Sequence, residues 1–469
     1  MIETNLQASP LHMAQTDNLP LIAAANPWRM LFFVALHLPL GLLLRTSSLG
    51  ATVHAFLTLA LGLFFLMRDR QPARIIYVTA YIVSAEVFWR MAGARIFWET
   101  GKYGLIVFSV LALLKYGRGM RIVQWPILYF ILLLPSILVM PYFDREALSF
   151  NLAGPLALAV AVMFFSIVRI DVDAFKKILI SMLAPSVALG AAVLSSIFSR
   201  QDLIFGNASN IATSGDYGPN QVSSILALGG LAAIYYALLE IKGVYRYIFL
   251  GLALWLMAQS ALTFSRTGLW NTALAVFISG LYLVRETRQR VGFIFVSLFL
   301  GMLAYFVILP FFDNVTDNAF SQRFSSLEST GREKIVQADL MIFQRYPLFG
   351  VGPDQSKPYH ALTFRSSSAH TEYSRMLSEH GSFGLLSLLL LAWAVARRFF
   401  AWREPVSKGY LIGLTTWALF FMLVNATRLA IPSFLFGLAA ANLVFLQDQA
   451  EPKASPVTRS VSSRHRGLI

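Results

Sequence analysis

The 469-residue sequence contains no cysteine and few charged residues. Without cysteine the chain has no disulfide bond, no thiolate metal ligand and no cysteine nucleophile, and the redox compartment stays open. Charged residues make up 13% of the chain and hydrophobic residues 57%, which leaves too few polar side chains to cover a water-soluble surface. These proportions predict a membrane protein.

Nucleotide-binding motifs are also missing. Gly350 and Gly352 lack the strand, helix and further residues of a nucleotide loop, and we interpret them as a tight turn. The sequence has no P-loop and no paired acidic motif of a sugar-nucleotide enzyme. The net charge of +14 comes from short basic clusters between apolar runs, which argues against a nucleic-acid partner. Residues 1–25 do not resemble a signal peptide, so we expect membrane insertion to begin with the first span.

Apolar segments follow one another along most of the chain, and roughly 20 apolar residues are enough to cross a bilayer. The segments are 29–45, 48–67, 74–92, 102–116, 122–140, 147–168, 175–198, 220–239, 245–263, 267–284, 291–312, 381–400, 409–425 and 430–446. They predict an all-α polytopic helix bundle with about 12–14 transmembrane helices. The expected parts are a cytoplasmic tail at 1–28, the first spans at 29–312, a large extracytoplasmic loop at 313–380, the last spans at 381–446 and a basic cytoplasmic tail at 447–469.

Basic residues occur in every second connection. If the N-terminus is cytoplasmic, each connection on the cytoplasmic side contains Lys or Arg, for example Arg68, Lys115, Arg169, Arg246, Arg288 and Arg397. Because Lys and Arg in short loops resist translocation, we expect both termini in the cytoplasm. The two long connections, 199–219 and 313–380, are then expected outside it, and loops of such length are commonly functional.

The larger of these connections contains a helical pattern. Apolar residues at helical spacing run from Gly331 to Tyr346, and Pro347 follows as a stop. The residues of the apolar face are Ile335, Ala338, Met341 and Ile342. The pattern predicts an amphipathic helix that lies along the membrane surface.

Histidines recur at positions 360, 370 and 380, but a spacing of ten residues does not suit metal ligands on one helix face, and we expect no metal. His370 lies at the start of the next helix. A neutral imidazole is suited to take a proton from a sugar hydroxyl, so His370 is a candidate general base. Glu372 and Glu379 are alternative bases, and a solvated loop histidine is the alternative without catalysis.

Arginines outside the cytoplasm form the second group of candidates. Arg266, in the short connection Ser265-Arg266-Thr267-Gly268, presents a planar fork of donors that suits a lipid diphosphate, with contact to lipid headgroups as the alternative. The other arginines expected on this positive face are Arg145, Arg200, Arg332 and Arg428. Inside the spans, Glu86 and Arg90 are predicted to pair structurally, and His37 and His54 to form hydrogen bonds within the bundle.

Three motifs together resemble the O-antigen ligase and polymerase-related family. The stretch from His370 to Gly384 is similar to its pattern of His, aromatic, Leu and Glu-x-Gly-x-x-Gly, carried here by Tyr373, Leu377, Glu379, Gly381 and Gly384. Gly331-Arg332 followed by Pro347-Leu-Phe-Gly350-Val-Gly352 is similar to a second motif, and Ser265–Gly268 to a Ser-Arg-x-Gly turn. The sequence departs from the usual pattern at Val336, Thr371 and Ser374.

The resemblance implies a metal-independent membrane glycosyltransferase without a cofactor, located in a bacterial inner membrane. Its expected donor is an undecaprenyl-diphosphate-linked glycan, and the long loop is expected on the periplasmic side. The family's roles fall on His370 near the acceptor hydroxyl and on Arg266 at the diphosphate, with Arg200 as a second arginine. The supporting residues are Glu372, Tyr373 and Glu379.

The sequence does not identify the acceptor. A polymerase would extend an O-antigen or exopolysaccharide, whereas a ligase would deliver the glycan to the lipid A core of lipopolysaccharide or to a protein. We favour a polymerase because nothing in the sequence marks a protein acceptor. A lipid-linked oligosaccharide flippase is the alternative function, but transporters commonly have paired halves, and the long loop here has no counterpart in the other half.

Overall fold

The computed structural model describes residues 26–200, 209–240, 243–284, 286–325, 331–363, 369–402 and 404–445, and it is a bundle of helices. The predicted all-α membrane fold is therefore confirmed. Within these residues, eight helical segments are long and apolar enough to cross a membrane: Pro27–Arg45 (α1), Ser48–Arg68 (α2), Arg145–Phe165 (α6), Val172–Phe198 (α7), Pro219–Leu239 (α8), Thr287–Asn314, Glu372–Ala401 (α16) and Pro405–Asn425 (α17). The predicted tail at 447–469 and nearly all of the tail at 1–28 lie outside the described residues.

The other predicted spans also contain helices, which are shorter or less apolar. They are Ala73–Met91 (α3), Thr100–Tyr116 (α4), Trp125–Ile131 (α5), Tyr245–Leu262 (α9), Arg266–Leu283 (α10) and Ile431–Ala440 (α18). The segment that begins at Thr287 consists of Thr287–Leu303 (α11), a π-helical turn at Ala304–Ile308 (η3) and Leu309–Val315 (α12). Two short 3-10 helices occur at Leu134–Val139 (η1) and Ala212–Ser214 (η2). The prediction at 122–140 is thus only partly helical, as α5 followed by η1.

The last predicted span, 430–446, is wrong in its second half. α18 ends at Ala440, and Asn442–Val444 (β2) pairs in parallel with Arg169–Asp171 (β1). The guanidinium of Arg398 donates hydrogen bonds to the carbonyl oxygens of Ala439 (3.2 Å) and Ala441 (2.6 Å). These bonds satisfy carbonyl groups that a helix leaves open at its end, so the chain can leave the helix and continue as a strand.

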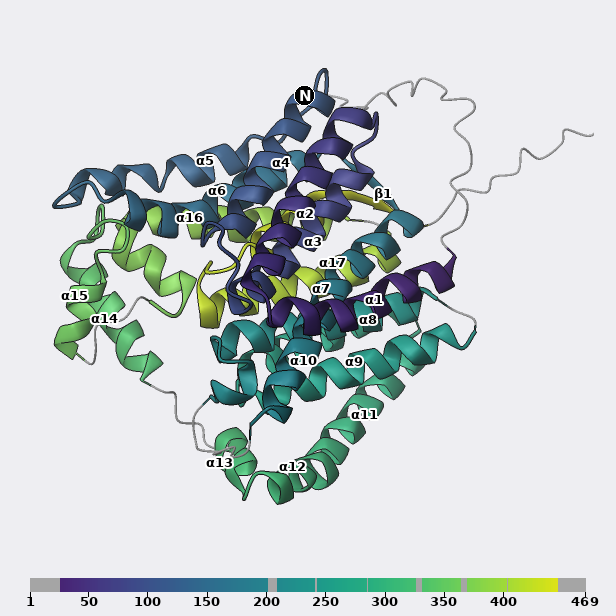
Figure 1. Cartoon of the computed structure of the whole chain (residues 1–469). Coiled ribbons are helices and arrows are strands. Elements are labelled where there is room, and N and C mark those ends of the chain that lie inside the picture. Colours follow the sequence, from purple (N-terminus) through teal and green to yellow (C-terminus); the bar gives the residue numbers. More distant parts are fainter. Residues whose placement is uncertain are drawn as a thin grey trace, which may run out of the picture.

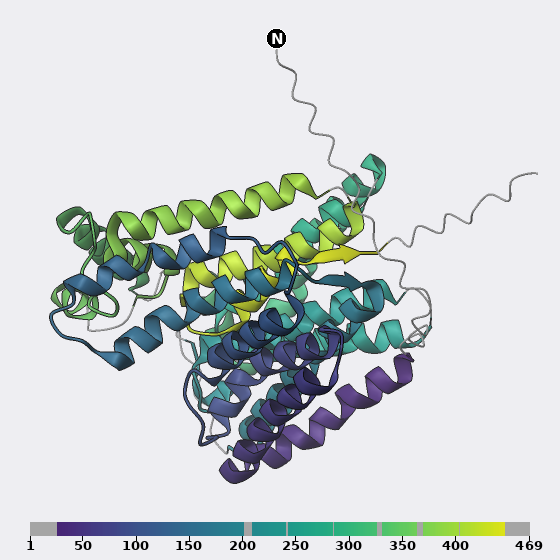
Figure 2. The same ribbon diagram turned by 90° about the horizontal axis from the view of Figure 1, so that it is seen from above.

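The predicted extracytoplasmic loop is largely helical. It contains Ala319–Ser325 (α13), Arg332–Arg345 (α14) and Lys357–Thr363 (α15), and α16 already begins at Glu372. Figures 1 and 2 show α14 and α15 at one end of the bundle, with the β1–β2 pair toward the opposite end. α16 runs between these two ends, so its first turn lies beside α14 and α15 and its last turn lies far from them.

α14 confirms the predicted helix but not the predicted location of its apolar face. Ile335, Ala338 and Ile342 are buried, and α14 packs against α15 and α16. These three residues are therefore covered by protein, and the location of the helix along the membrane surface stays a prediction. Met341, the fourth residue of the predicted face, is not covered by protein.

Two predicted contacts inside the bundle are confirmed. Arg90 forms a buried ion pair with Glu86, one helical turn earlier on α3. The Tyr81 hydroxyl lies 2.9 Å from Nε2 of His37 and 3.1 Å from Nε2 of His54. Both histidines are thus hydrogen-bonded within the bundle, as their position between apolar residues indicated.

Candidate functional site

Arg266 is the first residue of α10 and follows α9 after a short turn. The hydroxyl of Ser223 on α8 donates to the carbonyl oxygen of Ser265 (3.1 Å) and accepts the N–H of Gly268 (3.3 Å). A Cβ atom at Gly268 would lie 2.2 Å from the carbonyl oxygen of Ser223. Only glycine allows α8 and α10 to approach this closely, which explains the Ser-Arg-x-Gly pattern and holds Arg266 at the end of the bundle.

A second arginine reaches the same turn from α13. Arg323 is buried, and its Nε donates to the carbonyl oxygen of Phe264 at 3.1 Å. Phe264 packs its ring 5.7 Å from that of Phe320, which also belongs to α13. Sequence reasoning did not identify Arg323, because α13 is short and lies outside the three motifs. The only available signal was a further arginine in the long predicted loop.

Two more arginines complete a cluster with Arg266 and Arg323. Arg332 is the first residue of α14, and Arg428 lies in the turn between α17 and α18. Burial lowers the pKa of Arg332, and the neighbouring guanidinium groups of Arg266 and Arg428 lower it further. Burial also lowers the pKa of Arg323, together with Arg266 and Arg332. We call these four residues the arginine cluster.

The arginine cluster is a site at which an anion would be stabilised. Like charges that are close together disfavour one another, and an anionic ligand would relieve this repulsion. Arg266 and Arg332 both occupy the first position of their helices, where the helix dipole adds partial positive charge. Four guanidinium groups and two helix starts therefore all contribute positive electrostatic potential.

His370 is connected to the arginine cluster through Arg428. The histidine is half-buried and directly precedes Thr371, whose hydroxyl caps α16 by accepting the N–H of Tyr373. Nη2 of Arg428 donates to the carbonyl oxygen of Ala369, the residue before His370, at 2.9 Å. The structure thus brings together the two residue types that were predicted to act on acceptor and donor.

The predicted supporting residues are held in contacts of their own. Glu372 receives both Nε (3.0 Å) and Nη2 (2.6 Å) of Arg375, and it also accepts the N–H (3.0 Å) and the hydroxyl (3.1 Å) of Thr427. Glu379 accepts Nη1 of Arg375 at 2.9 Å and the hydroxyl of Ser356 at 3.1 Å. These contacts leave Glu372 little capacity to accept a proton from a substrate.

Tyr373 and Arg375, also on the first turns of α16, make contacts of two kinds. The hydroxyl of Tyr373 donates to the carbonyl oxygen of Leu419 on α17 at 3.0 Å, which is a contact between helices. Arg375 was not among the predicted residues, although its spacing from Glu372 and Glu379 places the three side chains on one helix face. That spacing was the signal that could have identified it.

The glycines of two motifs lie where the turn that follows α14 contacts α16. Gly350 and Gly352 have φ angles of +69° and +94°, which confirms the predicted tight turn. The N–H groups of Val351 and Gly352 donate to the carbonyl oxygens of residues 378 and 379 on α16, each at 3.0 Å. Gly381 interrupts α16 with a φ of +60°, and a Cβ atom there would lie 2.6 Å from the backbone nitrogen of Gly350. The glycines of both motifs are thus needed for this close backbone contact.

The three histidines of the predicted loop have separate surroundings. Nε2 of His360 lies 2.8 Å from a carboxylate oxygen of Asp339, and Nδ1 of His380 lies 2.7 Å from the hydroxyl of Ser136. Both of these histidines are buried, whereas His370 is half-buried. In the part of the chain that the structure describes, no group of three or more His, Cys, Asp or Glu residues could hold a metal ion.

Two predicted arginines are not linked to the arginine cluster by the described contacts. Arg200, at the end of α7, forms an ion pair with Asp216, which also lies 3.5 Å from Arg45. Arg145 is exposed at the start of α6. Neither residue is among the charges that shift the pKa values of Arg323 and Arg332. Their role in donor binding stays a prediction.

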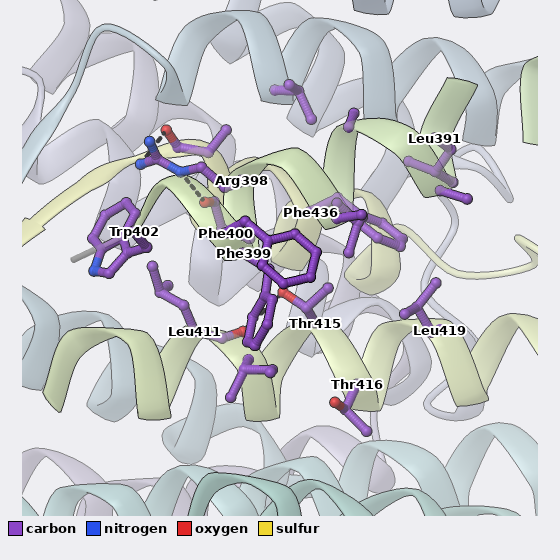
Figure 3. A pocket seen from close by; sticks show the side chains of 18 of the residues that line it. Leu391, Arg398, Phe399, Phe400, Trp402, Leu411, Thr415, Thr416, Leu419 and Phe436 are labelled. Carbon is purple, nitrogen blue, oxygen red and sulfur yellow. Dashed lines mark hydrogen bonds between the residues drawn. The ribbon is translucent and has the colours of Figure 1, made fainter. Parts of the chain in front are cut away.

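A cavity of about 580 Å³ lies between α16, α17 and α18. Figure 3 shows that its labelled lining is mainly apolar and aromatic, including Phe399, Trp402 and Leu411, with Arg398 bonded to backbone oxygens beside it. None of the four residues of the arginine cluster lines this cavity. Leu419, which does line it, accepts the hydroxyl of Tyr373.

Comparison with protein families gives a match to part of the chain. Residues 252–389 match a protein-family model described as O-antigen ligase. No curated protein matches the chain. The matched segment includes Arg266, Arg323, Arg332 and His370, whereas Arg428 lies outside it. Residues 252–389 of this polytopic membrane protein are thus similar to the O-antigen ligase family, as its three motifs indicated.

Proposed function

We propose that this protein transfers a glycan from an undecaprenyl-diphosphate carrier to an acceptor hydroxyl, on the periplasmic side of a bacterial inner membrane. The observation that carries the proposal is the arginine cluster, joined through Arg428 to the backbone beside His370. A diphosphate and a sugar hydroxyl are the two groups that such a pair of sites would bind. The match to the O-antigen ligase family supports the same class of reaction.

The reaction would proceed by displacement of the diphosphate. The acceptor oxygen attacks the anomeric carbon of the donor, the bond from that carbon to the phosphate oxygen breaks, and the electron pair leaves with the diphosphate. The proton of the acceptor hydroxyl passes to the imidazole of His370 and from there to solvent or to the leaving group. The products are the glycosylated acceptor and undecaprenyl diphosphate.

The arginine cluster would supply the main electrostatic stabilisation. Negative charge on the diphosphate increases as the sugar bond breaks, and guanidinium groups that are already in place stabilise this charge without reorganisation. Arginine can bind two phosphate oxygens at once, which also orients the leaving group. In this proposal the four arginines provide the positive charge that a divalent cation provides in other transferases, so the reaction needs no metal.

His370 is a better candidate for the general base than its acidic neighbours. The carboxylate of Glu372 is occupied by Arg375 and Thr427, and that of Glu379 by Arg375 and Ser356. Removing either carboxylate should therefore affect the packing of α16 more directly than proton transfer.

The proposal is tested by transfer with the purified protein. The donor is a glycan linked to undecaprenyl diphosphate, offered with a polysaccharide acceptor or with lipid A core, in the presence and absence of a chelator. We expect a glycosylated product and free undecaprenyl diphosphate in both conditions. The product that forms distinguishes a polymerase from a ligase. An intact donor that only changes its side of a proteoliposome membrane would instead indicate a flippase.

Variants at Arg266 provide the second arm of this test. We expect Arg266→Ala to abolish the product while the protein still inserts, because the contact to the diphosphate is lost. Arg266→Lys should restore activity only in part, since lysine keeps the charge but not the planar fork. Full activity of the alanine variant at normal membrane abundance would exclude Arg266 from the donor site.

A further inference from the structure

Arg428 lies in a turn that does not adopt a regular conformation. The turn runs from the end of α17 at Asn425 to the start of α18 at Ile431. Within it, Ala426 has a φ of +49°, in the left-handed region that residues with a Cβ atom rarely occupy. Such a conformation persists only where surrounding contacts hold it, and it is found most often at functional sites.

Two buried carboxylates from different parts of the chain hold this turn. Glu372, on α16, accepts both the N–H and the hydroxyl of Thr427, directly before Arg428. Glu86, on α3, accepts the N–H of Ala430 at 2.8 Å, two residues after Arg428. The backbone on each side of Arg428 is thus tied to a carboxylate that does not belong to the turn.

Each carboxylate is itself held by buried cations. Glu372 pairs with Arg375, and Glu86 pairs with Arg90. The second group continues through Glu99, which lies 3.8 Å from Arg90 and 2.6 Å from Nζ of Lys102. Buried ion pairs add little net stability, because removing the charges from water costs about as much as their attraction returns. Their clearer effect is to fix the direction of the carboxylates.

We infer that Glu86, Glu372 and Thr427 are positioning residues that hold the guanidinium of Arg428 ready for the donor diphosphate. This inference rests on the proposed function. α3 lies outside the segment that matches the family, so the first half of the chain contributes to the donor site through Glu86. A guanidinium that is already in place loses less conformational freedom when the diphosphate binds, which lowers the donor KM.

The mildest test changes only the hydroxyl of Thr427, in the full-length protein. Thr427→Val keeps the shape of the side chain but removes one hydrogen bond to Glu372, whereas Thr427→Ser keeps the hydroxyl. We expect Thr427→Val to raise the donor KM by about three- to tenfold, the effect of one hydrogen bond, and to leave the acceptor KM unchanged. Thr427→Ser should remain near the wild-type value.

The matched control is Thr415 on α17. Its hydroxyl is buried and donates only along its own helix, to the carbonyl oxygen of Leu411 at 2.8 Å. Thr415→Val therefore makes the same chemical change on α17, away from the turn. We expect it to leave the donor KM at the wild-type value.

A second pair of variants tests the contribution of α3. Glu86→Met and Glu99→Met each remove one carboxylate from the same buried group of charges, but only Glu86 contacts the turn. We expect both variants to be less stable and only Glu86→Met to raise the donor KM. A smaller folded fraction lowers the apparent kcat and leaves KM unchanged, so a loss of folding is distinguishable from a loss of positioning.

The Arg428→Ala variant distinguishes a failure of the positioning inference from a failure of the proposed donor site. If it raises the donor KM while Thr427→Val and Glu86→Met do not, the positioning inference is overturned and the proposed donor site stands. If Arg428→Ala leaves the donor KM unchanged in active protein, the assignment of Arg428 to the donor site is wrong and the inference falls with it. A decrease in kcat alone in Thr427→Val also overturns the inference.

Discussion

Replacing Arg332 by methionine should stabilise the protein and weaken donor binding at the same time. Arg332 is half-buried at the start of α14, and its pKa is lowered by burial and by Arg266 and Arg428. The folded protein therefore holds this charge at a cost. Methionine has a similar length and retains the apolar contacts of the side chain, but it removes the charge. Selection for anion binding would explain why a destabilising arginine is present.

The size of the effect follows from Coulomb's law. At a separation on the order of 7 Å, one pair of like charges costs about 0.6 kcal/mol in water and about 2.4 kcal/mol at an effective dielectric constant near 20. Two neighbouring guanidinium groups, those of Arg266 and Arg428, act on Arg332, and its partial exposure favours the smaller value. We therefore expect Arg332→Met to gain about 1 kcal/mol of unfolding free energy. Losing a charge-assisted contact to the diphosphate should raise the donor KM by about 10- to 100-fold.

The assay combines thermal unfolding in detergent with transfer kinetics. At low salt the melting temperature of Arg332→Met should exceed that of the wild type, and the difference should shrink at high salt because screening reduces the repulsion. Inorganic diphosphate should stabilise the wild type more than the variant. The control is Arg345→Met, at the exposed opposite end of the same helix, which should show neither effect. A lower melting temperature of Arg332→Met together with an unchanged donor KM would refute the reasoning.

Three further predictions concern the base, the glycine contact and the topology. His370→Ala should reduce kcat by about two to four orders of magnitude while donor binding survives, and near-normal turnover would remove it as the base. Gly381→Ala should lower the unfolding free energy by about 2 kcal/mol or more, because it combines a φ of +60° with a backbone contact at 2.6 Å. Gly251→Ala, which meets nothing within 4 Å in α9, should be neutral or stabilising by up to about 1 kcal/mol in the same melting assay, and equal losses in both variants would contradict the argument. A Gln355→Cys variant of this cysteine-free chain should react with an impermeant maleimide only from the periplasmic side, and labelling only from the cytoplasm would overturn the predicted orientation.

Features that depend on neighbouring residues were readable from the sequence. Apolar runs predicted the helices because a helix in lipid satisfies its own backbone hydrogen bonds. The pair of Glu86 and Arg90 followed from a spacing of one helical turn, and the turn at Gly350 and Gly352 followed from glycine's access to positive φ. The resemblance of three motifs to one family was also visible, because the residues of each motif are close together in the chain.

Long-range contacts were decided by the tertiary structure. No spacing rule brings Arg323 and Arg428 to Arg266, because the three residues lie on separate segments whose relative positions depend on how the helices pack. The same applies to the contact of Glu86 with Ala430, which joins α3 to the start of α18. The apolar face of α14 illustrates the limit: its periodicity predicted an apolar face along the membrane surface, whereas Ile335, Ala338 and Ile342 are buried in protein. Periodicity reports that a face is apolar, and only the packing of the other helices determines what that face contacts.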